Sequence, residues 1–314
     1  MSDAFTIGDR QVQAGTRATL ELPLARLFTG SWMSLPVAVV HGEPGPRLWL
    51  SAAIHGDELN GMEIIRRVLL RLDPRRLRGT VVAVPVVNVF GFVEQSRYLP
   101  DRRDLNRSFP GSPKGSLASR VAHLFVEEVV RKCDYGLDFH TGSLHRSNLP
   151  QIRCDHFDAE MLRLAHAFGA PVMFRSPPIK GTLRSTARRL GIHYLLFEGG
   201  EPLRFDSDVI DCGVDGTLRV LSALGMASFE VPEAPPSLLA RTTRWLRASR
   251  SGILHLQVGL GEPVHKGQVL GEILVDFFSR RSVKIRASDE GLVLGHTNTP
   301  LINQGDALVH LALR

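Results

Sequence analysis

The fold class follows from residues 48–71, whose sequence is LWLSAAIHGDELNGMEIIRRVLLR. Residues 48–54 form a short apolar run, which predicts a strand buried on both faces, and residues 58–71 carry apolar side chains at helical spacing. The same alternation recurs between about residues 36 and 230. Further strands are predicted at 36–40, 81–89, 135–139 and 192–197, and further helices at 116–131, 158–168 and 182–190. Strands and helices that alternate in this way predict an α/β protein, with helices packed on a sheet.

The pattern changes after residue 230. A proline-rich stretch, VPEAPP at residues 231–236, indicates a linker. Residues 247–314 then contain two similar units of short strands and glycine turns, so we predict a first domain over 1–236 and a small β domain over 237–314. This second domain resembles the biotinyl/lipoyl-type barrel-sandwich, whose V-x-x-G-x-x-V-x-x-G-Q-x-L pattern occurs at residues 258–270.

Carrier members of that barrel-sandwich family hold their cofactor on a lysine in the hairpin between the two repeats. The corresponding stretch here is DFFSRR at residues 276–281, which contains no lysine. We therefore interpret the small β domain as a module that supports the structure or shapes access to a site, and not as a cofactor carrier.

Composition excludes several classes of protein. With 314 residues, 43% hydrophobic and 22% charged, the chain is neither disordered nor collagen-like, and its three cysteines lack the spacing of a disulfide scaffold or a thiolate zinc site. The first residues do not form a secretory signal, and no apolar run reaches the roughly 18 residues of a membrane span, so a cytoplasmic protein without membrane contact is expected.

Arginine dominates the basic residues, with 33 arginines against five lysines and a net charge of +6. Two interpretations remain open: a solvated arginine-rich surface, or guanidinium groups that hold anions. Nucleic-acid binding is not expected, because the arginines are scattered and only three tyrosines and three tryptophans could stack on bases.

The strongest chemical signal is His55-Gly-Asp-Glu58, where a predicted strand gives way to a predicted helix. A histidine and a carboxylate at this spacing can face one point and offer nitrogen and oxygen ligands suited to zinc. His140, at the end of another predicted strand in LDFHTG, is the candidate third ligand. Three protein ligands leave a fourth position for water, as in catalytic zinc sites. The alternative is that each histidine only makes a hydrogen bond at a strand end.

Two further features fit a hydrolytic zinc site. Glu198 follows the apolar strand 192–197 and precedes two glycines, so its carboxylate could take a proton from a zinc-bound water. The loop at residues 97–111, RYLPDRRDLNRSFPG, combines four arginines with the amide of Asn106. Because guanidinium groups bind carboxylates in a two-pronged geometry, this loop predicts an anionic substrate.

Four motifs in this order resemble the succinylglutamate desuccinylase/aspartoacylase family, which is related to zinc carboxypeptidases. They are H-x-x-E at 55–58, D-L-N-R at 104–107, D-x-H-T at 138–141 and E-x-G at 198–200. The resemblance implies a three-layer α/β/α sandwich with a mixed sheet, followed by a C-terminal β domain. It also implies one zinc ion per chain.

The resemblance also assigns roles to residues. Its zinc ligands are His55, Glu58 and His140. It makes Glu198 the general base and acid, and Arg97 the group that polarises the scissile carbonyl. Its substrate-binding residues are Asn106, Arg107 and a further arginine ten residues before the base, which is Arg188, or Arg189 if the spacing slips by one residue.

The expected function is a zinc amidohydrolase that removes the acyl group from a small anionic N-acyl amino acid. Two alternatives stay open: a zinc carboxypeptidase that acts on peptides, and a metal-free protein that binds anionic metabolites. The sequence does not distinguish among acyl groups or among amino acids, and acetyl-diaminobutyrate deacetylases rank no higher than desuccinylases. It leaves the oligomeric state open, and a homo-oligomer is compatible with it.

Overall fold

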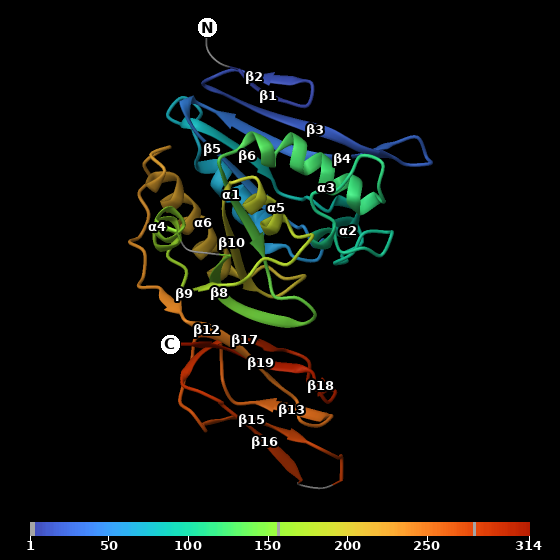
Figure 1. The fold of residues 1–314 in the computed structure, drawn as a ribbon, viewed down its shortest axis with the longest axis vertical. Helices are drawn as coiled ribbons and strands as arrows, with labels where there is room; N and C mark the ends of the chain where they lie inside the picture. Colours follow the sequence, from blue (N-terminus) through green and yellow to red (C-terminus); the bar gives the residue numbers. More distant parts are fainter. Residues whose placement is uncertain (1–3, 156–157, 279–280) are drawn as a thin grey trace.

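The computed structural model describes residues 4–155, 158–278 and 281–314. Its main feature is a large mixed sheet with the strand order β12-β19-β17-β8-β10-β7-β5-β6-β4-β3 (Figure 1). The strands before residue 230 are β1 (Phe5–Ile7), β2 (Arg10–Val12), β3 (Thr16–Arg26), β4 (Trp32–His41), β5 (Glu43–Ala52), β6 (Arg78–Val84), β7 (Tyr135–His140), β8 (Arg146–Cys154), β9 (Val172–Arg175) and β10 (His193–Gly200). Strands β6, β5, β7 and β10 are parallel neighbours, whereas β4 and β8 run antiparallel to them.

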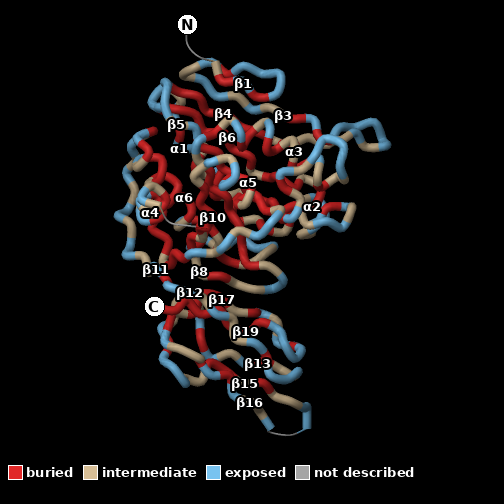
Figure 2. The backbone as a smooth tube through the Cα atoms, viewed as in Figure 1, coloured by how far each residue is buried: buried red, intermediate tan, exposed pale blue. Residues whose placement is uncertain are grey.

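Helices cover both faces of this sheet, which gives the expected three-layer sandwich. The helices are α1 (Asn60–Arg71), α2 (Val89–Val93), η1 (Leu105–Arg107), α3 (Leu117–Glu128), η2 (Val130–Lys132), α4 (Ala159–Phe168), α5 (Leu183–Arg189) and α6 (Ser207–Ala223). Helices α1, α4 and α6 share one apolar core with the sheet, while α3 and α5 contribute to a second core on the opposite face. The buried backbone of the central strands lies between these layers (Figure 2).

Local sequence explains where the helices begin and end. Ser116 caps α3, Asp158 caps α4, and Gly169 ends α4 in the left-handed conformation with φ 75°. The expected strand at 81–89 is too long, because β6 ends at Val84 and Asn88 instead caps α2 by accepting a hydrogen bond from Gly91 N at 2.9 Å. Strands β3, β8 and β9 and helix α6 were not predicted.

The C-terminal region has strands on two sheets around a separate apolar core. Its strands are β11 (Leu238–Ala240), β12 (Thr242–Arg247), β13 (Gly252–Leu256), β14 (Pro263–Val264), β15 (Val269–Leu274), β16 (Ser282–Arg286), β17 (Gly291–Thr297), β18 (Leu301–Ile302) and β19 (Ala307–Leu313). We call residues 241–314 the C-terminal module. In the hairpin at 276–281, residues 279 and 280 lie outside the described part of the chain.

The large sheet continues from one region into the other. Strand β17 of the C-terminal module pairs antiparallel with β8, and β11 pairs in parallel with β9. The module therefore packs beneath the α/β region (Figure 1) and shares its hydrogen-bonded sheet. The predicted domain boundary after residue 236 stays a prediction. Among the described helices, none has the length and apolar character needed to span a bilayer.

Candidate active site

Three neighbouring parallel strands place two candidate ligands and the candidate base together at their carboxyl ends. His55 follows β5, His140 is the last residue of β7, and Glu198 lies near the end of β10, directly opposite His140 in the strand register. Glu58 precedes α1, and that helix packs closely on the strands at Gly61. A β-carbon there would lie 2.7 Å from the Ala52 β-carbon, so a glycine lets the helix start beside β5 and brings Glu58 to the histidines.

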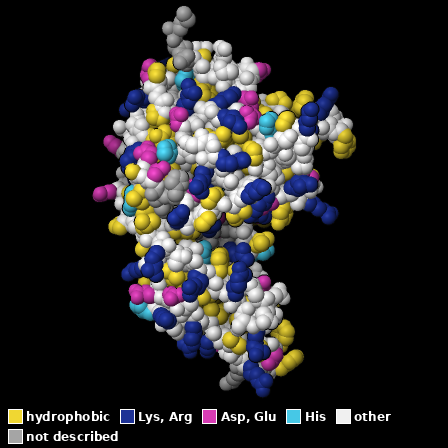
Figure 3. All heavy atoms as spheres, viewed as in Figure 1, with side chains coloured by type: hydrophobic (Ala, Val, Ile, Leu, Met, Phe, Trp, Pro, Cys, Tyr) yellow, Lys and Arg dark blue, Asp and Glu magenta, His cyan; other side chains and the backbone are white. Residues whose placement is uncertain are grey.

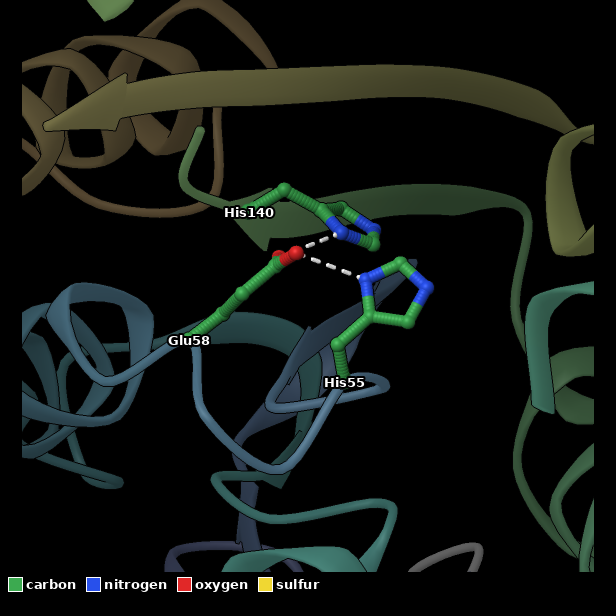
Figure 4. Close-up of side chains that lie close together, drawn as sticks. All are labelled: His55, Glu58 and His140. Atoms are coloured by element: carbon green, nitrogen blue, oxygen red, sulfur yellow. Dashed lines mark hydrogen bonds and ion pairs between the residues drawn. The ribbon is translucent and has the colours of Figure 1, made fainter. Parts of the chain in front are cut away.

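The side chains of His55, Glu58 and His140 converge (Figure 4). The Nδ1 atom of His55 lies 2.7 Å from Oε1 of Glu58, and Nδ1 of His140 lies 2.8 Å from Oε2 of the same carboxylate. All three residues are buried, with 4%, 2% and 4% of their surface exposed. Their ligand atoms lie within 4.8 Å of one another. Two imidazole nitrogens and one carboxylate oxygen at this spacing fit a zinc ion.

A second carboxylate holds the far side of each imidazole. Nε2 of His55 lies 3.2 Å from Oδ1 of Asp104, and Nε2 of His140 lies 2.9 Å from Oδ2 of Asp138. This arrangement is typical of metal-binding histidines, because the outer carboxylate fixes the ring and leaves the other nitrogen for the metal. The sequence motifs D-L-N-R and D-x-H-T contain these two aspartates, but the sequence analysis gave them no role.

These contacts determine the protonation of the cluster. Burial lowers the pKa of His140, but Asp138 and Glu58 outweigh it, so the pKa is raised well above its ordinary value. Burial likewise raises the pKa of Glu58, but His55 and His140 outweigh that effect and the pKa is lowered. Glu58 is therefore a carboxylate, as a metal ligand must be.

Asp138 is itself held by a buried network that the sequence did not predict. Its Oδ2 accepts a hydrogen bond from Tyr194 Oη at 2.7 Å, and its Oδ1 accepts one from Ser51 Oγ at 2.7 Å. Burial, reinforced by Asp138, raises the pKa of Tyr194 well above its ordinary value, so the hydroxyl stays protonated as a donor. The available signal was the two-residue spacing on β7, which places Asp138 and His140 on one face.

Arg97, the predicted carbonyl-polarising residue, lies at the rim of the cluster. Its Nη2 donates to Oδ2 of Asp104 at 2.9 Å, and its Nη1 lies 3.5 Å from Oε1 of Glu58. Asp104 thus bridges Arg97 and His55. The side chain of Arg97 is 17% exposed, which leaves part of the guanidinium open to a ligand.

The predicted substrate-binding residues lie in different surroundings. Asn106 is buried, and its Oδ1 accepts a hydrogen bond from Leu183 N at 3.0 Å, which ties the D-L-N-R loop to the start of α5. Arg107 is exposed, and its Nη1 donates to the Asn106 carbonyl at 2.6 Å. Arg188 is not brought to the cluster. It lies in the last turn of α5, with its side chain 57% exposed, and pairs with Asp155 at 3.3 Å. The alternative residue Arg189 is also exposed.

Arg184, one helical turn earlier, was missed by the sequence analysis. It lies in the first turn of α5, next to the contact with Asn106, and is only 8% exposed. Its Nη2 donates to Ser176 Oγ at 3.3 Å and to the Pro177 carbonyl at 3.2 Å. Its Nε and Nη1 have no hydrogen-bond partner among the described residues. Counting ten residues back from Glu198 selects the exposed Arg188, whereas burial distinguishes Arg184 from it.

Two donors on β8 hold the carboxylate of Glu198. Asn148 Nδ2 donates to its Oε2 at 3.0 Å, and the guanidinium of Arg153 forms an ion pair with the same oxygen. Burial raises the pKa of Glu198, and Arg153 opposes that shift. A raised pKa makes this carboxylate a stronger base and so a better proton acceptor.

Most of the described arginines lie at the protein surface. On the face shown in Figure 3, Lys and Arg side chains are distributed over both regions of the molecule, without a single basic stripe. Among the arginines that the structure describes, all but Arg184 are exposed or part-buried, which fits the solvated-surface interpretation.

Comparison with known proteins identifies close similarities across the chain. Residues 44–224 match the family model of the succinylglutamate desuccinylase/aspartoacylase catalytic domain. Over 313 residues, 93% of this chain and 90% of the relative, the sequence is 29% identical to the N-alpha-acetyl-L-2,4-diaminobutyric acid deacetylase of Halomonas elongata.

Solved structures share the fold. A succinylglutamate desuccinylase/aspartoacylase from Rhodobacter sphaeroides superposes with a TM-score of 0.84 at 27% identity, covering 94% of this chain and 95% of that one. The product-bound ectoine utilization protein EutE (DoeB) of Ruegeria pomeroyi gives a TM-score of 0.86 at 24% identity, covering 95% of each chain, and supports the fold alone.

Proposed function

This chain belongs to the succinylglutamate desuccinylase/aspartoacylase family, and from that membership and the site geometry we propose that it is a zinc-dependent hydrolase of N-acyl amino acids. One observation carries the proposal. The Nδ1 atoms of His55 and His140 and the carboxylate of Glu58 converge at the sheet edge where Glu198 also lies. A metal site beside a carboxylate with a raised pKa is the arrangement that amide hydrolysis by water requires.

Zinc bound by His55, Glu58 and His140 would polarise the amide carbonyl and lower the pKa of a water molecule toward about 7. Glu198 takes a proton from the attacking water and returns it to the amine nitrogen as the carbon–nitrogen bond breaks. Arg97, at the rim of the cluster, donates to the carbonyl oxygen as negative charge develops on it. The products are a carboxylate and a free amine.

We assign substrate binding to Arg184 and to the D-L-N-R loop, which contains Arg107. Arg184 is buried, keeps its charge at all ordinary pH values and has two nitrogens without a partner in the described chain, so a substrate carboxylate would complete its hydrogen bonds. Asn106 positions α5 and thereby Arg184. Arg107, the last residue of the D-L-N-R motif, is exposed and could bind the outer part of an anionic substrate.

The decisive variant is Glu198→Gln. We expect it to keep about one zinc ion per chain and to lose roughly 10²- to 10⁴-fold in kcat, which is the usual contribution of a general base. Glu272→Gln, in an exposed ion pair with Lys284, is the control and should behave as wild type. Retained activity in Glu198→Gln would reject the assignment of the base.

A substrate panel separates the alternatives. Free-amine release would be measured with N-alpha-acetyl-L-2,4-diaminobutyrate, which the name of the Halomonas relative suggests, with N-succinylglutamate, and with short peptides. Hydrolysis of the acyl amino acids alone supports a deacylase, whereas peptide cleavage supports a carboxypeptidase. A purified protein with less than about half an equivalent of zinc and no turnover would support the metal-free binding protein, since catalytic zinc sites are stoichiometric.

A further inference from the structure

The two donors that hold Glu198 are connected to the C-terminal module, Asn148 by direct contact with Gly295 and Arg153 through the ring of Phe174. We propose that this module is a positioning element of the catalytic base, in which Gly295 of β17 sets the place of Asn148 and so of the Glu198 carboxylate. The inference rests on the proposed function, because it assumes that Glu198 is the base. It gives the C-terminal module a role in turnover that a separate accessory domain would not have.

The first contact is the pairing of β17 with β8. Gly295 lies opposite Asn148 in this antiparallel pair. A β-carbon at Gly295 would lie only 2.5 Å from Oδ1 of Asn148 and 3.1 Å from the Ser147 carbonyl oxygen. Since the φ angle of Gly295 is one that other residues adopt, closeness to Asn148 is what requires a glycine.

The side chain of Asn148 is confined by its surroundings. It is 5% exposed, and its Nδ2 donates to Oε2 of Glu198 at 3.0 Å. A methyl group at Gly295 must displace the amide, because a carbon and an oxygen cannot stay 2.5 Å apart. The displaced amide would take its donor away from the carboxylate.

The second contact supports Arg153, the other partner of Glu198. Its guanidinium lies over the ring of Phe174, 5.3 Å from the centroid. Phe174 meets His310 of β19 edge to face at 6.4 Å, and His310 stacks on Trp245 of β12 at 4.4 Å. Phe174 and His310 are each 4% exposed, so this row of rings is fixed from the module to the arginine.

These contacts leave Glu198 few alternative positions. The residue sits on β10, between β7 with its metal ligand and β8 with its two donors. A base that is held in place keeps its carboxylate within reach of the attacking water, which a shift of about 1 Å would disturb. Gly295 is therefore a positioning residue that acts through Asn148.

The test compares two alanine variants of the same module. Gly295→Ala introduces the contact with Asn148, whereas the β-carbon of Gly259→Ala would meet no atom within 4 Å. We expect Gly295→Ala to lower kcat about tenfold, as substitutions behind a catalytic group do, with KM and bound zinc unchanged and with a lower Tm, because a buried amide is displaced. Gly259→Ala should match wild type in all four. Wild-type kcat in Gly295→Ala would overturn the proposal.

A double variant establishes the route. If Gly295 acts through Asn148, adding Gly295→Ala to Asn148→Ala should cause no further loss, because the side chain that it displaces is already gone. An additional tenfold loss would overturn the route. Should Gly295→Ala alone fail to fold, the double variant is expected to fold as Asn148→Ala does. A double variant that also fails to fold would contradict the proposal, because Gly295 would then be required for another reason.

A crystal structure of the variant tests the displacement of Asn148 without relying on turnover. In Gly295→Ala, the Asn148 amide should no longer contact Glu198, and an unchanged contact would overturn the inference. Glu198→Gln tests the proposed function separately. An active Glu198→Gln rejects the base, whereas an inactive Glu198→Gln beside a fully active Gly295→Ala rejects only the positioning role of the module.

Discussion

Two regions of this molecule bury histidines to the same extent but shift their pKa values in opposite directions. His55 and His140 at the candidate metal site and His310 at the contact between β19 and β9 are each 4% exposed. The pKa values of His55 and His140 are raised, because neighbouring carboxylates outweigh burial. The pKa of His310 is lowered to about 3 by burial, with Arg153 acting in the same direction.

Hydrogen-bond partners, and not the degree of burial, therefore distinguish the histidines of the candidate metal site from a histidine that only packs in the core. His55 and His140 have a carboxylate at each ring nitrogen. His310 has rings on two sides, and its Nδ1 has no hydrogen-bond partner among the described residues. Concentrated buried charge has a cost in stability, and its presence at the strand ends indicates a site that the fold maintains for chemistry.

The largest difference between the two kinds of histidine is expected in zinc binding, when one of the proposed ligands is removed. We expect His140→Ala to weaken zinc binding at least about a hundredfold, because one of three protein ligands is lost and the Glu58 contact with it. His310→Gln, at an equally buried histidine, should keep its zinc. Metal analysis after dialysis against a weak chelator measures both, and a zinc-replete His140→Ala would contradict the proposed site.

Arg184, like His310, has buried nitrogens with no hydrogen-bond partner in the described part of the chain, but its guanidinium cannot become neutral. We expect Arg184→Gln to lower kcat/KM by about 10- to 100-fold, mainly through KM, as the loss of a hydrogen-bonded ion pair to a substrate carboxylate would. Arg188→Gln, on the same helix but exposed and paired with Asp155, is the matched control. Steady-state kinetics with both variants decide, and an equal effect of the two would argue against Arg184.

The outer support of His140 should matter less than the ligand itself. Tyr194→Phe removes a hydroxyl that donates to Asp138, and we expect about a tenfold loss of zinc affinity. Tyr135→Phe removes the hydroxyl that contacts Glu160 in the part-buried start of β7, and should leave the affinity unchanged. Competition with a chromogenic chelator measures the ratio. Equal zinc affinities in the two variants would show that the Asp138 network does not hold the ligand.

Local sequence signals explain which parts of the site could be predicted. His55, His140 and Glu198 each lie at the end of an apolar strand and Glu58 lies before an apolar helix, so periodicity alone places them at the ends of these elements. Their joint position follows from parallel pairing of β5, β7 and β10, which alternation also predicts.

The missed residues depend on contacts without a sequence period. Asn148 and Arg153 reach Glu198 only because β8 pairs antiparallel with β10, and β8 was not predicted. Arg184 and Arg188 are both arginines of α5. They differ in burial because the first turn of the helix packs against the sheet. The contact of Gly295 with Asn148 joins residues 147 positions apart, which no local pattern records.

The smallest expected effect concerns stability and the pH dependence of His310. Its folded pKa of about 3 lies below the ordinary value of 6.5, so on acidification the unfolded chain binds the proton first. The associated stability is complete above about pH 6.5 and is lost progressively as the pH falls toward 3. Between pH 7.5 and 5.5 this amounts to about 1 kcal/mol of unfolding free energy.

His310→Phe tests this directly, because phenylalanine keeps a ring against Trp245 but binds no proton. Urea unfolding at pH 7.5 and 5.5 should give a pH-dependent loss that is about 1 kcal/mol smaller in His310→Phe than in wild type. All other titrating groups are common to the two proteins, so the difference isolates His310. Equal pH dependence in His310→Phe and wild type would mean that His310 is not held neutral, and the contrast with His140 would then rest on geometry alone.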